Sequence, residues 1–294
     1  MLDMFFYERW SYMKIARVLF QFNDACPNKC PFCYMPFDGK GVGNIELWLK
    51  IVNRLKDFNV ELLSLAGGDP LYYDEFYEFV DKIDKFSYIN LVTSGRFLDK
   101  EKYAKICKKI DSIGLPVDEC DKMLKRQRFS QKVFDEVDKN IDYFKSVHDN
   151  ITINTLVTPI NKENLNDIGE YLVAKKLKIW NLYQYWGFDF MKNNSVYQMN
   201  DEEFYIELNK MKREFSGVMD VNGWTSTERK YGYFFVTSLG RVYTINKLNH
   251  NEYVFIGSIF DENIYEKWLI HNTSEESEKR FHIITDREIV NNSK

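Results

Sequence analysis

The sequence has few cysteines, no excess of basic residues and no long apolar run. Only five of its 294 residues are cysteine, and 40 basic against 44 acidic residues give a formal charge of −4. Such a balance lacks the electrostatic footprint of nucleic-acid binding, so we expect no nucleic-acid partner. Charged residues interrupt every apolar run near the start of the chain, unlike a signal peptide or membrane span. We therefore expect a cytoplasmic protein with no membrane partner, whose thiols stay reduced.

The residues that are abundant are those of a folded domain. Apolar residues make up 45% of the chain, charged residues 29% and aromatic residues 16%. No internal repeat, low-complexity tract or linker rich in proline or glycine divides the sequence. We expect one large core in a single domain, of the size at which α/β barrels form.

Strand-like and helix-like segments alternate over the first two thirds of the chain. Each short β-rich or apolar run is followed by a run with apolar residues at helical spacing. Strands are expected at 14–22, 60–66, 88–93, 112–117, 150–158 and 178–186, and helices at 45–58, 74–86, 98–110, 130–147 and 164–176. This pattern predicts an α/β fold, a partial (β/α)6 TIM-like barrel of parallel strands, because six units fall short of the eight that close a barrel.

The alternation breaks after residue 186. Beyond it we expect a helix at 201–215, a hairpin at 230–245 that turns at residues 238–240, and a segment at 254–268 that caps the open side of the barrel. The chain is thus expected to divide into an N-terminal segment (1–13), a barrel core (14–190) and a small α+β C-terminal extension (191–294).

Three of the five cysteines lie within eight residues, directly after the first expected strand. Cys26, Cys30 and Cys33 have the spacing C-x3-C-x2-C, at what becomes the C-terminal mouth of a parallel barrel. Three thiolates can bind three irons of a [4Fe–4S] cluster and leave the fourth iron open for another ligand. A zinc-binding structural protein is the alternative, but a structural zinc site needs four protein ligands. Cys107, Cys120 and four histidines form no second ligand pair.

This cysteine motif on a six-unit β/α pattern resembles the radical S-adenosylmethionine (SAM) superfamily over residues 14–186. The resemblance implies an enzyme in which the amino and carboxylate groups of SAM bind the open iron. One electron from the reduced cluster, supplied by a donor such as flavodoxin or ferredoxin, then cleaves SAM to methionine and a 5′-deoxyadenosyl radical. That radical abstracts hydrogen from a substrate. No cysteine follows Cys120, so no auxiliary cluster is expected.

Further motifs are similar to this family in order and place. Phe32, just before the third cysteine, is expected against the adenine of SAM. The run Gly67-Gly68-Asp69-Pro70 resembles the Gly-Gly-Glu-Pro motif that holds the SAM amino group, with a carboxylate one methylene shorter. Ser94 ends the third strand, where relatives carry a residue that can hydrogen-bond SAM; an ordinary turn is the alternative.

Two charged positions follow. Asp118 lies after the fourth strand, where relatives often read Ser-x-Asp, and the resemblance implies contact with ribose hydroxyls of SAM or with the substrate. A helix N-cap is the alternative role for an aspartate there. Arg126 and Arg128 lie where relatives carry an arginine for the SAM carboxylate, and we favour Arg128.

The substrate is left open by the sequence. Among single-cluster relatives the chain is similar to the viperin-like group, which dehydrates nucleoside triphosphates. Where that group has basic residues, this chain has Thr152, Ile179 and Asn181, while Lys40 is one retained cation. Because phosphate oxygens bind cations, we expect a small molecule, a sugar or nucleoside, or a peptide side chain instead. A viperin-like nucleoside triphosphate dehydratase is the alternative.

The aromatic run at 178–190 is expected to supply the substrate pocket. Alternation along the sixth strand separates Gln184 from Asn181 and Tyr185, and one of these two faces lines the barrel mouth. A neutral pocket of amides and aromatic rings makes Asn154, Gln184 and Tyr185 the substrate candidates. Ordinary interior hydrogen bonding is the alternative role for these side chains.

Overall fold

A computed structural model describes residues 13–23, 26–35, 43–120, 128–191 and 195–277. The strands in these ranges are β1 (Arg17–Gln21), β2 (Leu62–Ala66), β3 (Tyr88–Val92), β4 (Ser112–Pro116), β5 (Ile151–Val157), β6 (Ile179–Gln184), β7 (Asp220–Trp224), β8 (Phe235–Thr237), β9 (Arg241–Ile245) and β10 (Tyr253–Ser258). They form one sheet in the order β10-β9-β8-β1-β2-β3-β4-β5-β6-β7.

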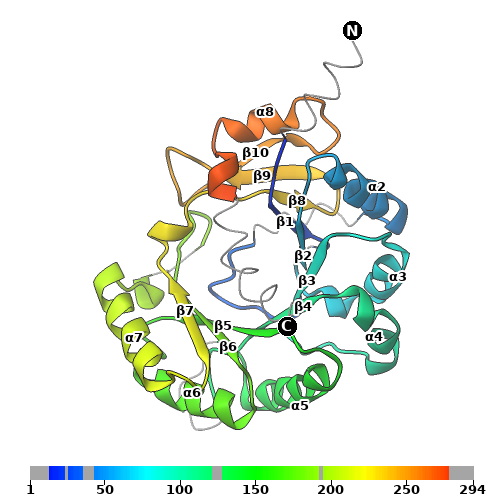
Figure 1. Cartoon of the computed structure of the whole chain (residues 1–294). Helices are drawn as coiled ribbons and strands as arrows, with labels where there is room; N and C mark the ends of the chain where they lie inside the picture. Colours follow the sequence, from blue (N-terminus) through cyan, green and yellow to red (C-terminus); the bar gives the residue numbers. More distant parts are fainter. Residues whose placement is uncertain (1–12, 24–25, 36–42, 121–127, 192–194, 278–294) are drawn as a thin grey trace.

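Helices lie along the outside of the curved sheet, as Figure 1 shows. They are α2 (Ile45–Lys56), α3 (Asp74–Lys82), α4 (Lys100–Ile106), α5 (Gln131–Val147), α6 (Leu165–Ala174), α7 (Asp201–Glu214) and α8 (Ile264–Leu269). Short 3-10 turns are η1 (Pro70–Tyr72), η2 (Cys107–Lys109), η3 (Lys162–Asn164), η4 (Ser195–Tyr197) and η5 (Thr227–Arg229). No helix in the described part of the chain has the length and apolar character needed to cross a membrane.

The partial barrel expected from the sequence is confirmed. Strands β1 to β6 correspond to the six expected strands, and each pairs in parallel with the next along the chain. Strand β7 adds to β6 and strand β8 adds to β1, also in parallel. Because β7 and β10 are the two edges of the sheet, the barrel stays open.

The segment after residue 190 extends this same sheet at both ends. The expected hairpin at 230–245 is formed by β8 and β9, and Gly240 takes the positive φ of +75° that its turn requires. Residues 254–268 form β10 and α8, and β10 pairs with β9 in antiparallel fashion at the sheet edge. These residues therefore lengthen the sheet next to β1.

The two faces of the sheet have different surroundings. On the convex face, large side chains such as Phe20 and Leu63 are fully buried in the main core with the helices. On the concave face, Leu19 and Ala66 belong to a smaller apolar cluster that includes Trp186 and Phe235. Strand β5 alternates buried and half-buried side chains, so its concave side is partly open. The concave face is therefore where a ligand can enter.

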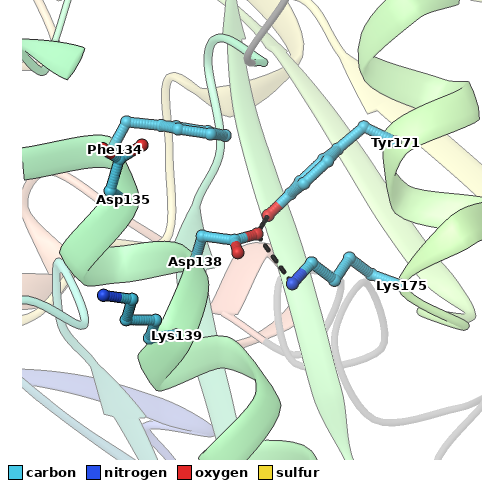
Figure 2. Close-up of a pocket in the computed structure, with 6 residues that line it drawn as sticks. All are labelled: Phe134, Asp135, Asp138, Lys139, Tyr171 and Lys175. Atoms are coloured by element: carbon cyan, nitrogen blue, oxygen red, sulfur yellow. Dashed lines mark hydrogen bonds and ion pairs between the residues drawn. The ribbon is translucent and has the colours of Figure 1, made fainter. Parts of the chain in front are cut away.

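A surface pocket of about 490 Å³ lies on the convex side, between α5 and α6 (Figure 2). It is lined by Phe134, Asp135, Asp138, Lys139, Tyr171 and Lys175. The Tyr171 hydroxyl donates to Asp138 Oδ1 at 2.6 Å, and Lys175 Nζ lies 2.8 Å from the same oxygen. These polar groups pair with one another across the two helices. The pocket is thus a structural contact, on the opposite side of the sheet from the concave face.

A buried histidine at the end of α5 gives the fold a pH dependence. His148 Nε2 lies 2.7 Å from the Tyr103 hydroxyl, and burial lowers the pKa of His148 from 6.5 to about 4. Because the unfolded chain then binds the proton more tightly, stability is lost as the pH falls from 6.5 towards 4. We expect the free energy of unfolding to drop by about 1–2 kcal/mol more in wild type than in His148→Gln between pH 7 and 5. Urea denaturation at both pH values measures this, and equal slopes would contradict it.

Candidate functional site

The cysteine loop begins directly beyond β1 at the mouth of the barrel. Cys26, Cys30 and Cys33 are half-buried free thiols, and the Cys33 N–H donates to the Cys30 carbonyl at 3.2 Å. Burial raises the pKa of Cys26 to about 12 and that of Cys33 to about 11, and the cysteines raise one another's pKa values further. The free thiols are therefore protonated at neutral pH, and a metal centre must displace their protons to bind.

These donors have the chemistry of an iron–sulfur site. Three thiols from one short loop are the ligand set of a cubane cluster with one open iron. Within the described ranges, no group of three or more His, Cys, Asp or Glu side chains is arranged to hold a single metal ion. The residues present therefore fit a [4Fe–4S] cluster that takes a further ligand from outside the protein.

Arg128 connects the cysteine loop to the end of β4. Its Nη1 donates to Cys30 Sγ at 3.7 Å, and its guanidinium lies 4.8 Å from the centre of the Phe32 ring. Its Nε donates to Asp118 Oδ2, and the Asp118 side chain is completely buried. This ion pair raises the pKa of Arg128, so a fixed positive charge lies beside the cysteine sulfurs. Arg126 lies outside the described residues.

Asp118 is committed to protein contacts on both carboxylate oxygens. Besides the bond from Arg128 to Oδ2, its Oδ1 accepts from the Leu156 N–H at 2.6 Å. The neighbouring Glu119 accepts from the backbone N–H groups of Arg128 and Phe129, at 3.3 and 2.6 Å. Two carboxylates after β4 thus fix the position of Arg128. This positioning role is the one that the geometry supports for Asp118.

The Gly67-Gly68-Asp69 run joins the ends of three strands. Gly67 has φ +134°, and a Cβ there would lie 2.8 Å from the Asn23 carbonyl oxygen. Asp69 is 1% exposed and accepts from the Thr93 hydroxyl at 2.6 Å, the Ser94 N–H at 3.0 Å and the Leu71 N–H at 3.2 Å. The Ser94 hydroxyl also donates to it. Burial raises the pKa of Asp69, and these four donors oppose that rise. Asp69 and Ser94 therefore bind each other.

A ladder of three asparagines lies on the concave face, at the mouth of the barrel. Asn154, Asn181 and Asn222 are direct neighbours on β5, β6 and β7. Asn181 Nδ2 donates to Asn154 Oδ1 at 3.3 Å, and Asn222 Nδ2 donates to Asn181 Oδ1 at 3.2 Å. Gly114 leaves room for this arrangement, because a Cβ there would lie 2.9 Å from Asn154 Nδ2. The expected candidate Asn154 is thus one end of a longer amide surface.

The other two expected substrate residues lie in different surroundings. Gln184 is on the convex face, where its Nε2 donates to the Met199 carbonyl at 3.0 Å and to Asp201 Oδ1 at 2.8 Å. Its Oε1 accepts from the Ser226 N–H at 2.5 Å, so its amide is used to hold the start of α7 and the chain after β7. Alternation along β6 was predicted correctly, but it could not tell which face is concave.

Tyr185 lies close to the cysteine loop through a chain of rings. Its ring centre is 5.5 Å from that of Tyr197, which is itself 5.5 Å from that of Phe32. Burial raises the pKa of Tyr185 to about 12, so its hydroxyl stays protonated at neutral pH. That hydroxyl donates to Met191 Sδ at 3.2 Å. The structure therefore brings Phe32 and Tyr185 together, and Tyr185 belongs to the wall beside the cysteine loop.

Two arginines that sequence reasoning did not consider belong to the concave side. Arg17 on β1 donates through Nε to Ser64 Oγ at 3.3 Å. The Arg229 guanidinium lies 5.2 Å from the Tyr183 ring centre and 5.7 Å from that of Trp186. Lys40, the cation that the sequence retained, lies outside the described residues. The site is thus less poor in cations than the sequence suggested.

The central asparagine of the ladder gives a direct test of this geometry. Asn181 is 4% exposed and takes part in both amide contacts, so Asn181→Leu removes two hydrogen bonds and strands both neighbours. We expect its free energy of unfolding to fall by about 1–3 kcal/mol. Asn222→Leu, which removes one of the two contacts, is the matched control and should lose roughly half as much. Equal losses in urea denaturation would argue against the ladder.

Comparison with known proteins adds family and fold. The Radical SAM superfamily model matches residues 20–172. An S-adenosylmethionine-dependent nucleotide dehydratase of Flammeovirga pacifica is 22% identical over 253 residues, which cover 81% of this chain and 84% of that protein. An uncharacterized protein of Archaeoglobus fulgidus is 26% identical over 149 residues, which cover 49% of this chain and 35% of that protein.

Solved structures share the architecture. Streptococcus suis SuiB bound to S-adenosylmethionine has a TM-score of 0.67 at 16% identity, with 86% of this chain and 65% of SuiB covered. The enzyme anSMEcpe with bound AdoMet has a TM-score of 0.67 at 17% identity, with 94% and 98% covered. The chain spans less than two thirds of the Archaeoglobus protein and of SuiB. A family model that matches more than half of the residues, on a partial barrel of this kind, shows that the chain belongs to the radical SAM superfamily and is an enzyme.

Proposed function

We propose that this enzyme reductively cleaves SAM at a single [4Fe–4S] cluster and uses the resulting 5′-deoxyadenosyl radical to abstract hydrogen from a substrate on the concave face. Cys26, Cys30 and Cys33 are the proposed ligands. The observation that carries the proposal is Arg128, whose guanidinium meets Cys30, Phe32 and Asp118 at one point of the barrel mouth. A charge fixed beside the cysteines is suited to an anionic group of a ligand bound there.

The cluster, when bound, supplies the electron that cleaves SAM, and the chain's own residues bind and orient SAM beside it. Arg128 is the proposed partner of the SAM carboxylate, because guanidinium forks match carboxylates. Gly67 and Gly68 let the backbone approach the ligand closely. Asp69 and Ser94 brace the β2 and β3 loops against each other. Phe32 is 5% exposed, and we propose it for the adenine edge of the site.

For the substrate, the asparagine ladder favours a neutral hydrogen-bonding group. Amide side chains offer both donors and acceptors, and Tyr183 stacks on Trp224 at 5.4 Å beside them. Amides flanked by aromatic rings suit a peptide side chain, a sugar or a nucleobase. An electron donor such as flavodoxin or ferredoxin is part of the same proposal, since the cluster must be reduced before SAM is cleaved.

Nucleotide dehydration is the second candidate. It is supported by the alignment with the Flammeovirga nucleotide dehydratase along 81% of the chain. Arg17 and Arg229 on the concave side give it cations for a polyphosphate that the sequence pattern did not reveal. A nucleotide would also place its base against amides and rings, so the two candidates share part of the same surface.

Anaerobic reconstitution tests the cofactor. The proposal requires about four iron and four sulfide per chain, and a change in the electron paramagnetic resonance spectrum of the reduced cluster when SAM is added. A colourless zinc protein would contradict it. Adding a mixture of nucleoside triphosphates to the reduced enzyme with SAM then separates the substrate candidates. Acceleration of 5′-deoxyadenosine formation supports nucleotide dehydration, whereas an unchanged rate supports the neutral substrate classes.

A further inference from the structure

Asn23 carries an unused acceptor at the mouth of the barrel. It lies two residues beyond β1 and is fully buried at 0% exposure. Its Oδ1 has no hydrogen-bond donor in the part of the chain that the structure describes. Its Nδ2 donates to the Asp69 carbonyl at 3.4 Å, and this contact fixes the amide, because the reversed amide would set oxygen against oxygen. A buried acceptor without a donor costs free energy, so it needs an explanation.

The surroundings of Asn23 place this acceptor where SAM is expected. Its carbonyl accepts from the Gly68 N–H at 2.9 Å, and the Gly67 Cα lies against the same carbonyl. Cys26, the first proposed cluster ligand, is only three residues further along the chain. The amide of Asn23 is therefore held between the glycine run at the end of β2 and the cysteine loop.

The carboxylate that family resemblance assigns to the SAM amino group is occupied. Asp69 accepts four hydrogen bonds, from Leu71, Thr93 and the backbone and hydroxyl of Ser94. It is also one methylene shorter than glutamate, and it is 1% exposed. An amino group at this point therefore needs another acceptor, and Asn23 Oδ1 is the neighbouring buried atom that lacks a donor.

We propose that Asn23 Oδ1 accepts a hydrogen bond from the α-amino group of SAM. The inference rests on the proposed function, since it assumes that SAM binds at the cysteine loop. An α-amino group keeps N–H donors whether or not its nitrogen binds iron, so it satisfies an acceptor that the protein leaves without a partner. In this view Asp69 is a positioning residue that holds the β2 and β3 loops, while Asn23 provides the contact.

The test is equilibrium binding to the reconstituted, oxidised enzyme, which does not turn over. The two probes are S-adenosylhomocysteine and its analogue with hydrogen in place of the α-amino group. Asn23→Leu keeps the volume and removes the acceptor. We expect it to bind S-adenosylhomocysteine about 10- to 100-fold more weakly by calorimetry, the range for a hydrogen bond with a polar partner of this kind. Binding of the deaminated analogue should be unchanged.

The matched control is Asn140→Leu, which removes another amide that donates to a loop at the barrel mouth, Nδ2 to the Gly95 carbonyl at 2.8 Å. It should leave the preference between the two probes unchanged. Iron content is measured for every variant, and Asn23→Ala replaces Asn23→Leu if the latter fails to hold iron. If wild type binds neither probe, the proposed function itself fails. If wild type binds and the Asn23 variants lose both probes equally, or neither, the role of Asn23 is overturned.

Discussion

The Cys30→Ala variant is expected to lose both its iron–sulfur absorption and 5′-deoxyadenosine formation. Cys30 is one of three thiols on the loop, and it is the thiol that Arg128 reaches. Two remaining ligands cannot hold the three irons that the loop is proposed to bind. Residues that only support a metal ligand typically cost roughly 10- to 100-fold when removed, so loss of a ligand should exceed about 100-fold. Iron and sulfide content, the visible spectrum and the 5′-deoxyadenosine yield measure the effect.

Cys107→Ala is the matched control for this experiment. Cys107 is half-buried at the end of α4, and its thiol donates to the Ala104 carbonyl at 3.4 Å within the same turn. Its loss should leave iron content and activity as in wild type. A Cys30→Ala protein that keeps full iron and activity would remove the cysteine loop from the account.

Arg128→Met is expected to reduce both stability and SAM affinity. Asp118 is 0% exposed, and without Arg128 its carboxylate keeps only the Leu156 N–H as a donor. Removing one partner of a buried ion pair costs about 3–5 kcal/mol, because the other charge stays buried. If the guanidinium also binds the SAM carboxylate, SAM affinity should fall by about 10- to 100-fold. Urea denaturation and calorimetry measure the two effects separately.

A double variant distinguishes the two roles of Arg128. In Arg128→Met/Asp118→Asn the buried charge is gone, so most of the lost stability should return while SAM affinity stays low. Arg96→Met is the arginine control, since Arg96 touches the same loop through Asn28 at 3.1 Å but reaches no cysteine. Its ion pair with Glu136 is partly exposed and should contribute at most about 1 kcal/mol. Normal SAM affinity in the double variant would show that Arg128 is purely structural.

The core of the barrel could be predicted from the sequence because its signals are local. Apolar runs such as 60–66 and 88–93 form β2 and β3 within two residues of the expected bounds. Strand β7 could not be found this way, since its sequence DVNGW is polar and contains glycine. It forms because β6 offers a free edge to pair with, which is a property of the assembled sheet.

The site divides in the same way. The cysteines and Gly67-Gly68-Asp69 could be predicted because their order along the chain follows the strands that carry them. The environment of Gln184 could not, because a period of two defines two faces without saying which one helices cover. Asn23 could not be found from sequence at all. A missing hydrogen-bond donor is a result of packing, which involves residues far apart in the chain.

The most direct test of the central claim is whether the reconstituted, chemically reduced enzyme forms 5′-deoxyadenosine from SAM under anaerobic conditions. The wild-type chain is predicted to form it together with methionine in equal amounts, and Cys30→Ala is predicted to form neither. A wild-type protein with full iron and sulfide that binds SAM yet yields no 5′-deoxyadenosine, with any reductant or added nucleotide, would contradict the account.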